Sequence, residues 1–220
     1  MPLAVSLSCC SFLFEPREDA ARDAGDSPSD AALVTEACGV FAGFQSDFTS
    51  SLPIPPWDIA GAEPLLVDSS ANLQPLDSGS RGLQAQVDMG AGALTFRLGP
   101  HESGSLLMIS VGGIQFHRNI GNRGVYFFDE SDNTTTTIAA GGPYRDGRQE
   151  LQVMLKIWPE VDESTGTNLA VQYLLADAQG QGQYAFEPAR TYVSGTPAVR
   201  VHGLRRVDTV PILLHEMSCL

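Results

Sequence analysis

The chain has little positive charge. Of its 220 residues, 13 are lysine or arginine and 26 are aspartate or glutamate, so the formal net charge is −13 at pH 7. Lys156 is the single lysine. Because nucleic-acid-binding proteins neutralise phosphates with clustered basic side chains, this composition excludes a general nucleic-acid binder. It also argues against an anionic membrane surface as a partner.

Cysteines and long apolar runs are scarce as well. The four cysteines are Cys9, Cys10, Cys38 and Cys219, and no C-x-x-C pair is present. Neither a zinc ribbon nor a thioredoxin-like motif is therefore supported, and we expect buried free thiols. No run approaches the roughly 18 apolar residues of a membrane span. The apolar first 14 residues lack a preceding positive charge and a following cleavage motif, so we expect no signal peptide.

The negative charge is concentrated at the beginning of the chain. Residues 1–80 contain 12 acidic residues and two arginines, which gives a charge of −10, whereas residues 81–220 have a charge of −3. Residues 15–32 resemble an acidic linker, and Pro53, Pro55 and Pro56 exclude a central strand. We expect residues 1–80 to form an N-terminal strand, an acidic arm and a proline-rich loop. Residues 81–220 are expected to form the body of a single domain.

From residue 82 onward, apolar and polar residues alternate with period two, which is typical of β-strands with one buried face. Glycine-containing turns separate the short strands, and no long helical periodicity interrupts them. The fold class predicted is all-β, an antiparallel β-sandwich of the jelly-roll type. The expected strands include residues 105–111, 113–119, 123–128, 134–139, 151–158, 168–175, 183–187, 190–193, 197–203 and 207–214.

Two features predict how these strands are ordered. Residues 105–111 (SLLMISV) are apolar on both faces, which indicates a central strand. Residues 3–8 and 207–214 both have the composition of strands, and in jelly-roll sandwiches the first and last strands often pair. We therefore expect both ends of the chain to lie in the same sheet.

The body resembles concanavalin-like (laminin-G-type) sandwich modules. The resemblance rests on residues 94–98 (LTFRL), on residues 106–116 with their central Gly112-Gly113 pair, and on the long strand of residues 150–158. It covers just over half of the chain and is a resemblance of pattern, without a diagnostic motif. It implies a module that binds glycans or proteins through loops at one edge, often with a calcium ion.

The segment Trp158-Pro159-Glu160-Val161-Asp162-Glu163 resembles the E-x-D-x-(x)-E signature of laminarinase-like glycoside hydrolases. In that family, glutamates on alternate residues of one strand flank the scissile bond. The match ends at Asp162, because the required second glutamate is absent from the same-face position. We interpret this segment as a solvated acidic turn.

The segment Asp129-Glu130-Ser131-Asp132-Asn133 offers oxygen ligands of the kind that calcium prefers. Asp129, Asp132 and Asn133 are the candidate ligands, although the spacing and glycine of an EF-hand loop are absent. An acidic hairpin tip is the alternative interpretation. The sequence requires no other cofactor.

Aromatic residues accompany several strands. Tyr126 and Phe128 are expected to share one face of their strand, and Phe127 the other. Tyr144 and Trp158 are the candidate ligand-binding residues, because exposed aromatic side chains favour interfaces. Packing in the core is the alternative for the aromatic residues as a group.

No catalytic motif is complete. His215-Glu216-Met217-Ser218-Cys219 approaches H-E-x-x-H but ends in cysteine, and G-x-S-x-G, the P-loop and G-x-G-x-x-G are absent. We expect a non-enzymatic structural or interaction protein of a larger assembly, plausibly a phage-like virion component. It would be located in the virion or cytoplasm, as an oligomer with other protein subunits as partners. The alternatives are a carbohydrate-binding or laminarinase-like sandwich, with glycans as partners, and a secreted adhesin.

Overall fold

A computed structural model describes residues 38–52, 54–75, 79–100, 106–119, 124–130, 133–137, 149–162, 166–179, 184–186, 196–204 and 211–219. These residues form a short 3-10 helix and a series of antiparallel strands. Among them, no helix is long and apolar enough to cross a membrane. The elements are η1 (Gly39–Phe41), β1 (Asp58–Gly61), β2 (Leu65–Val67), β3 (Ser70–Asn72), β4 (Ser80–Gln86), β5 (Gly92–Leu98), β6 (Leu106–Val111), β7 (Ile114–Asn119), β8 (Gly124–Asp129), β9 (Thr134–Thr137), β10 (Leu151–Asp162), β11 (Gly166–Asp177), β12 (Tyr184–Phe186), β13 (Ala198–Leu204) and β14 (Leu213–Ser218).

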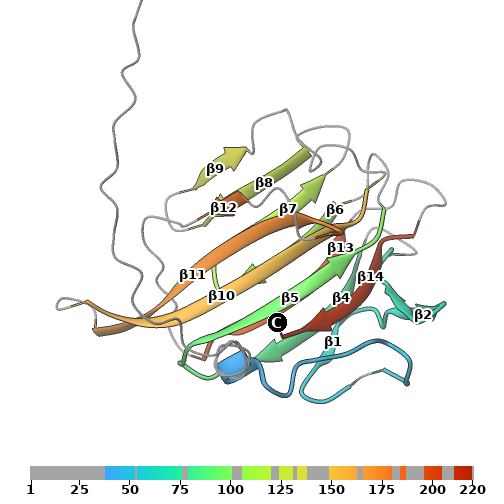
Figure 1. Ribbon diagram of the computed structural model, residues 1–220, viewed down its shortest axis with the longest axis horizontal. Coiled ribbons are helices and arrows are strands. Elements are labelled where there is room, and N and C mark those ends of the chain that lie inside the picture. Colours follow the sequence, from blue (N-terminus) through green and yellow to red (C-terminus); the bar gives the residue numbers. More distant parts are fainter. Residues whose placement is uncertain are drawn as a thin grey trace, which may run out of the picture.

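The strands form two layered sheets (Figure 1). Within the described chain, sheet 1 has the order β1-β4-β13-β6-β7-β8-β9, and sheet 2 has the order β12-β11-β10-β5-β14-β3-β2. Neighbouring strands are hydrogen-bonded and antiparallel throughout both sheets. The predicted antiparallel β-sandwich is therefore confirmed.

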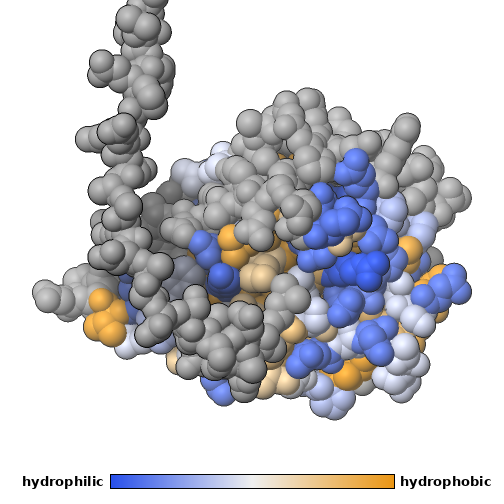
Figure 2. Space-filling model, in the orientation of Figure 1, coloured by the Kyte–Doolittle hydropathy of each residue, from blue (hydrophilic) through white to orange (hydrophobic). Residues whose placement is uncertain are grey.

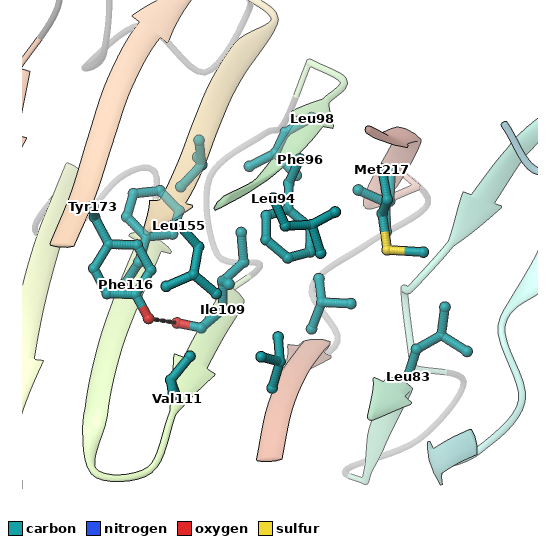
Figure 3. Packing of buried hydrophobic residues seen from close by; sticks show 14 of the residues in the cluster. Leu83, Leu94, Phe96, Leu98, Ile109, Val111, Phe116, Leu155, Tyr173 and Met217 are labelled. Carbon is teal, nitrogen blue, oxygen red and sulfur yellow. Dashed lines mark hydrogen bonds between the residues drawn. The ribbon is translucent and has the colours of Figure 1, made fainter. Parts of the chain in front are cut away.

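The core lies between the two sheets and follows from the period-two pattern. Alternate residues of a strand point to opposite faces, so each strand supplies every second side chain to the core. Figure 3 shows this packing: Leu94, Phe96 and Leu98 of β5 lie on one side. Ile109 and Val111 of β6 and Phe116 of β7 come from the other sheet. These side chains are almost completely buried.

Tyr173 of β11 connects the two sheets through the core. Its hydroxyl lies 3.1 Å from the carbonyl oxygen of Ile109 (Figure 3) and 3.1 Å from that of Ile114, both in sheet 1. The hydroxyl has one proton, so the two carbonyl oxygens share it as acceptors. Its ring packs beside Phe116 and Phe127, at centroid distances of 6.1 and 5.7 Å. Burial raises the pKa of this phenol. The buried hydroxyl therefore stays protonated and serves as a neutral donor.

Arg118 makes a second connection between the sheets. It lies on the core-facing side of β7, where it is 2 % exposed. Its guanidinium donates to the carbonyl oxygens of Gly99, just after β5, at 2.9 Å and of Gln149, just before β10, at 2.6 Å. A buried cation is tolerated here because backbone oxygens replace part of its hydration.

Most of the predicted strands match observed ones to within a few residues, and the expected central strand is β6, the fourth of seven in sheet 1. Residues 190–193 lie outside the described residues. The last strand begins at Leu213, later than expected. Its neighbours are β3 and β5, and residues 3–8, the expected partner, lie outside the described part.

The interpretation of Trp158–Glu163 as a turn was wrong for residues 158–162, whereas Glu163 lies outside the described residues. Strand β10 continues to Asp162, which pairs with Gly166 of β11. The pairing of β10 with β5 ends at Ile157, so the β10–β11 hairpin extends beyond its neighbour (Figure 1). Pro159 is tolerated there because one side of the strand no longer needs a hydrogen-bond donor.

The chain between residues 38 and 80 contains more regular structure than the expected loop. Strand β1 joins sheet 1, and β2 and β3 form the edge of sheet 2. Trp57 is a buried anchor of this segment, and its indole nitrogen donates to the carbonyl of Phe44 at 2.9 Å. Cys38 and Cys219 are half-buried free thiols, whereas Cys9, Cys10 and the acidic segment 15–32 lie outside the described residues.

Candidate functional site

The outer face of sheet 1 has an unusual concentration of polar and aromatic side chains. We call it the polar face and define it by nine residues that alternate with core residues along β4, β6, β7, β8 and β13. Because the intervening residues belong to the core, these nine side chains point away from it. They are Gln84, Met108, Ser110, Gln115, His117, Tyr126, Phe128, Arg200 and His202.

Strand register arranges the polar face into two rows that run across the sheet. In one row, His202 of β13 lies opposite Met108 of β6, which lies opposite His117 of β7, which in turn lies opposite Tyr126 of β8. The second row contains Gln84, Arg200, Ser110, Gln115 and Phe128 in successive strands. Side chains from five strands, distant in the sequence, therefore meet on one surface.

A chain of hydrogen bonds orients His117. The Gln115 side-chain nitrogen donates to Glu130 Oε1, so the Gln115 oxygen is left to accept a hydrogen bond. His117 Nε2 lies 2.7 Å from that oxygen and must carry the proton. The second ring nitrogen, Nδ1, is then an acceptor in the neutral ring, and it is buried without a hydrogen-bond partner.

Both histidines of the polar face are neutral at pH 7. Burial, and secondly the nearby His202, lowers the pKa of His117 to about 4. Burial, and secondly the nearby Arg200, lowers the pKa of His202. A neutral imidazole, like a hydroxyl group, can both donate and accept a hydrogen bond.

Aromatic rings border His117. The Tyr126 ring is stacked on the imidazole with a centroid distance of 4.6 Å and an interplanar angle of 26°. Phe128 approaches edge-on at 6.4 Å. The polar face therefore combines neutral hydrogen-bonding groups with flat apolar surfaces, which is the combination found in sites for small polar ligands.

Glycine at position 82 leaves room for His202. A Cβ at this position would lie 2.4 Å from the Cβ of His202 and 2.3 Å from the carbonyl oxygen of Val201. Gly82 lies directly opposite His202 in the strand pairing. The absence of a side chain there therefore permits the close approach of β4 and β13 at the edge of the polar face.

A second group of polar side chains lies on sheet 2. Ser70 Oγ is 2.8 Å from His215 Nδ1, and His215 Nε2 is 3.8 Å from Glu150 Oε1. Arg97 donates to the other oxygen of Glu150, at 3.1 and 3.2 Å. His215 lies where the register of β14 shifts, at a β-bulge. Ser70 is 4 % exposed, and the contacts of this group join residues of β3, β5 and β14 with Glu150, just before β10.

The predicted ligand-binding residues do not meet the polar face within the described structure. Trp158 is 37 % exposed on the outer side of sheet 2, in the projecting hairpin. Tyr144 lies outside the described residues. Figure 2 shows hydrophilic and hydrophobic residues interspersed over the surface visible in that view, where the described residues are coloured.

The candidate calcium ligands are separated as far as they are described. Asp129 lies on the core-facing side of β8 and is 6 % exposed, whereas Asn133 is exposed in the turn before β9 with φ +55°. Asp132 lies outside the described part. Within that part, no three His, Cys, Asp or Glu side chains form a group that could hold a metal ion. The calcium site stays a prediction.

Sequence reasoning missed the polar face. Alternation places Gln115 with His117, and Tyr126 with Phe128, on one side of a strand. No local pattern relates His117 to His202, because they lie in strands far apart in the sequence. The missing information was the register that aligns β13, β6, β7 and β8. Strands β6, β7 and β8 are consecutive along the chain, but only the hydrogen bonding of β6 with the distant β13 determines where His202 lies relative to them.

Comparison with solved structures identifies the fold. The carbohydrate recognition domain of Emp46p in its potassium-bound form matches with a TM-score of 0.55 and 7% sequence identity, over 80% of this chain and 95% of that chain. Lectin II from Ulex europaeus matches with a TM-score of 0.54 and 7% identity, over 79% and 95% of the two chains. The fold is a concanavalin-like β-sandwich. No family model and no curated protein matches the sequence.

The concanavalin-like fold corrects our functional hypothesis. The sequence led us to favour a structural component of an assembly such as a virion. The matching domains include a carbohydrate recognition domain and lectins, one of them lectin I-B4 from Griffonia simplicifolia, which has a TM-score of 0.50, 8% identity and coverage of 78% and 94% of the two chains. The virion hypothesis was wrong, and the alternative of a carbohydrate-binding sandwich is better supported.

Proposed function

We propose that this protein binds carbohydrate, without cleaving it, on the polar face of sheet 1. The fold resembles that of a carbohydrate recognition domain. At a sequence identity of 7%, this match shows a shared fold and does not show a shared function. The observation that supports the polar face is the arrangement of Gln115, His117 and Tyr126. It joins an oriented neutral imidazole to an amide and to an aromatic ring.

The protonation states suit a sugar. Each sugar hydroxyl both donates and accepts hydrogen bonds, and the neutral His117 and His202, together with Ser110 and Gln84, offer both kinds of partner. Low exposure strengthens such bonds, because they then compete less with water. His117 is 8 % exposed, His202 9 % and Ser110 5 %.

A glycan array probed with the full chain, followed by calorimetry with the best glycan, tests this proposal. Gln115→Ala removes the group that orients His117 and should weaken binding on the order of 10-fold. Gln152→Ala is the matched control, because Gln152 is a partly buried glutamine on the outer side of sheet 2, bonded to the carbonyl of Ala178. Thermal unfolding of both variants verifies that they are folded.

An array without any hit would contradict the proposal. Equal affinity of the wild type and the Gln115→Ala variant would contradict the choice of face. If Gln115→Ala proves unstable, His202→Ala removes a hydrogen-bonding side chain at the other end of the same surface and serves the same purpose.

A further inference from the structure

Arg200 is an exposed cation on the polar face. It belongs to β13, the third of seven strands in sheet 1. Gln84 and Ser110 lie opposite it on the two neighbouring strands. These neighbours are neutral, so neither compensates the guanidinium charge.

The guanidinium of Arg200 has no hydrogen-bond or ion-pair partner within the described structure. Arg97 on sheet 2, by contrast, lies 3.1 Å from Glu150. The contrast indicates that the charge of Arg200 is left available.

The carboxylates on the same side of sheet 1 do not compensate Arg200. Glu130 accepts a hydrogen bond from Gln115. Asp58 of β1 lies opposite Gln84, which places it two strands from Arg200, about 10 Å away by ordinary strand spacing. Arg118 and Arg81 lie on the core-facing side, because they alternate with the outward residues. Arg200 is therefore the single permanent cation on this side among the described residues.

We propose that the glycan bound on the polar face carries an anionic group, a sugar carboxylate or a sulfate ester, which Arg200 binds through paired N–H···O hydrogen bonds. This inference rests on the proposed carbohydrate-binding function. The planar guanidinium presents parallel donors that match two oxygens of a carboxylate or sulfate. Gln84 and Ser110 flank it as neutral hydrogen-bonding groups for the adjacent hydroxyls.

The expected preference for acidic over neutral glycans follows from the neutral side chains around Arg200. Both histidines are uncharged at pH 7, so among the described residues of this face the attraction for an anion depends on Arg200. A neutral sugar would leave the guanidinium without a counter-charge, whereas an acidic sugar would supply one. The rest of the polar face binds hydroxyl groups in either case. The difference in affinity between acidic and neutral glycans should therefore depend on Arg200.

The experiment compares neutral, carboxylated and sulfated glycans on one array, and then measures the best ligands by calorimetry at two salt concentrations. We expect acidic glycans to bind preferentially to the wild type. Arg200→Gln should weaken their binding on the order of 10- to 100-fold and leave neutral glycans unaffected. Arg200→Lys, which keeps the charge but loses the paired geometry, should give an intermediate loss. The comparison of carboxylated with sulfated glycans shows which of these two groups Arg200 binds.

Lys156→Gln is the matched control, because it removes one positive charge from the outer side of sheet 2. It should leave the affinity unchanged. Binding of neutral glycans as tightly as acidic ones, with no effect of Arg200→Gln, would overturn this inference while the proposed function stands. Failure to bind any glycan would overturn both. An equal loss in the Arg200→Gln and Lys156→Gln variants would indicate general electrostatics and would also overturn it.

Discussion

The imidazole of His117 lies against the phenol ring of Tyr126, with ring centroids 4.6 Å apart and ring planes 26° from parallel. The two residues are directly opposite each other on β7 and β8, on the side of sheet 1 that faces away from the core. Burial keeps the imidazole neutral, so the pair presents a hydrogen-bonding ring and a flat phenol without adding charge. The predictions below test this surface and the sandwich that supports it.

Stability should fall as the pH is lowered from about 6.5 toward 4, because of His117. Its pKa is lowered from 6.5 to about 4 on folding, so between these values the unfolded chain binds the additional proton and is favoured. Between pH 7 and pH 5, the wild type should lose about 1–2 kcal/mol more unfolding free energy than a His117→Gln variant. Urea unfolding of both proteins at the two pH values measures this difference. Identical pH dependence would show that His117 does not titrate as described.

Tyr173→Phe should destabilise the protein by about 1–2 kcal/mol. The substitution keeps the ring between Phe116 and Phe127 but removes the hydroxyl that joins β11 to the carbonyl oxygens of β6 and β7. Denaturant unfolding at pH 7 measures the loss. Carbohydrate affinity should remain that of the wild type, since this hydroxyl lies in the core. An unchanged midpoint of denaturant unfolding would show that the hydroxyl contact between the two sheets does not stabilise the fold.

Gly99→Ala should destabilise sheet 2 by about 1–3 kcal/mol. A Cβ there would lie 2.7 Å from His215 Nε2 and 3.0 Å from Leu213 Cβ, so it would displace the ring that Ser70 contacts. Gly43→Ala is the control, because a Cβ at that position meets no atom within 4 Å. Thermal unfolding should separate the two variants clearly, and equal midpoints would argue against a fixed position of His215.

Trp158→Ala should leave carbohydrate binding within about twofold of the wild type. Trp158 was the exposed aromatic residue that the sequence predicted as a ligand contact, but it lies on the outer side of sheet 2, in the projecting β10–β11 hairpin. Calorimetry with a glycan identified on the array provides the comparison. A loss of 10-fold or more would move the binding site from the polar face to this hairpin.

Much of the fold could be predicted from local sequence. The alternation of Leu151, Val153, Leu155 and Ile157 with more polar residues predicts β10, because one buried face suffices to define a half-exposed strand. The end of that strand could not be predicted in the same way. Pro159 and the acidic residues after it resemble a turn, and they are tolerated in a strand because the hairpin passes the end of β5.

The site could be predicted only in fragments. The sequence alone places Gln115 and His117 on one side of a strand, and Tyr126 and Phe128 on one side of another. It also establishes the shortage of cations that makes Arg200 conspicuous. Arg200 and His202 are more than 80 residues from His117 along the chain, so no local pattern relates them to it.

The sequence by itself determined the all-β class and the half-buried strands, because these depend on composition and on the alternation of neighbouring residues. The tertiary structure alone decided which strands became neighbours and which outward side chains met. Register is a property of hydrogen bonds between distant segments, and it aligned Arg200 with Ser110 and His202 with Met108 and His117. Burial in that arrangement then lowered the pKa of both histidines, and among the described residues Arg200 became the one permanent cation on this side of sheet 1.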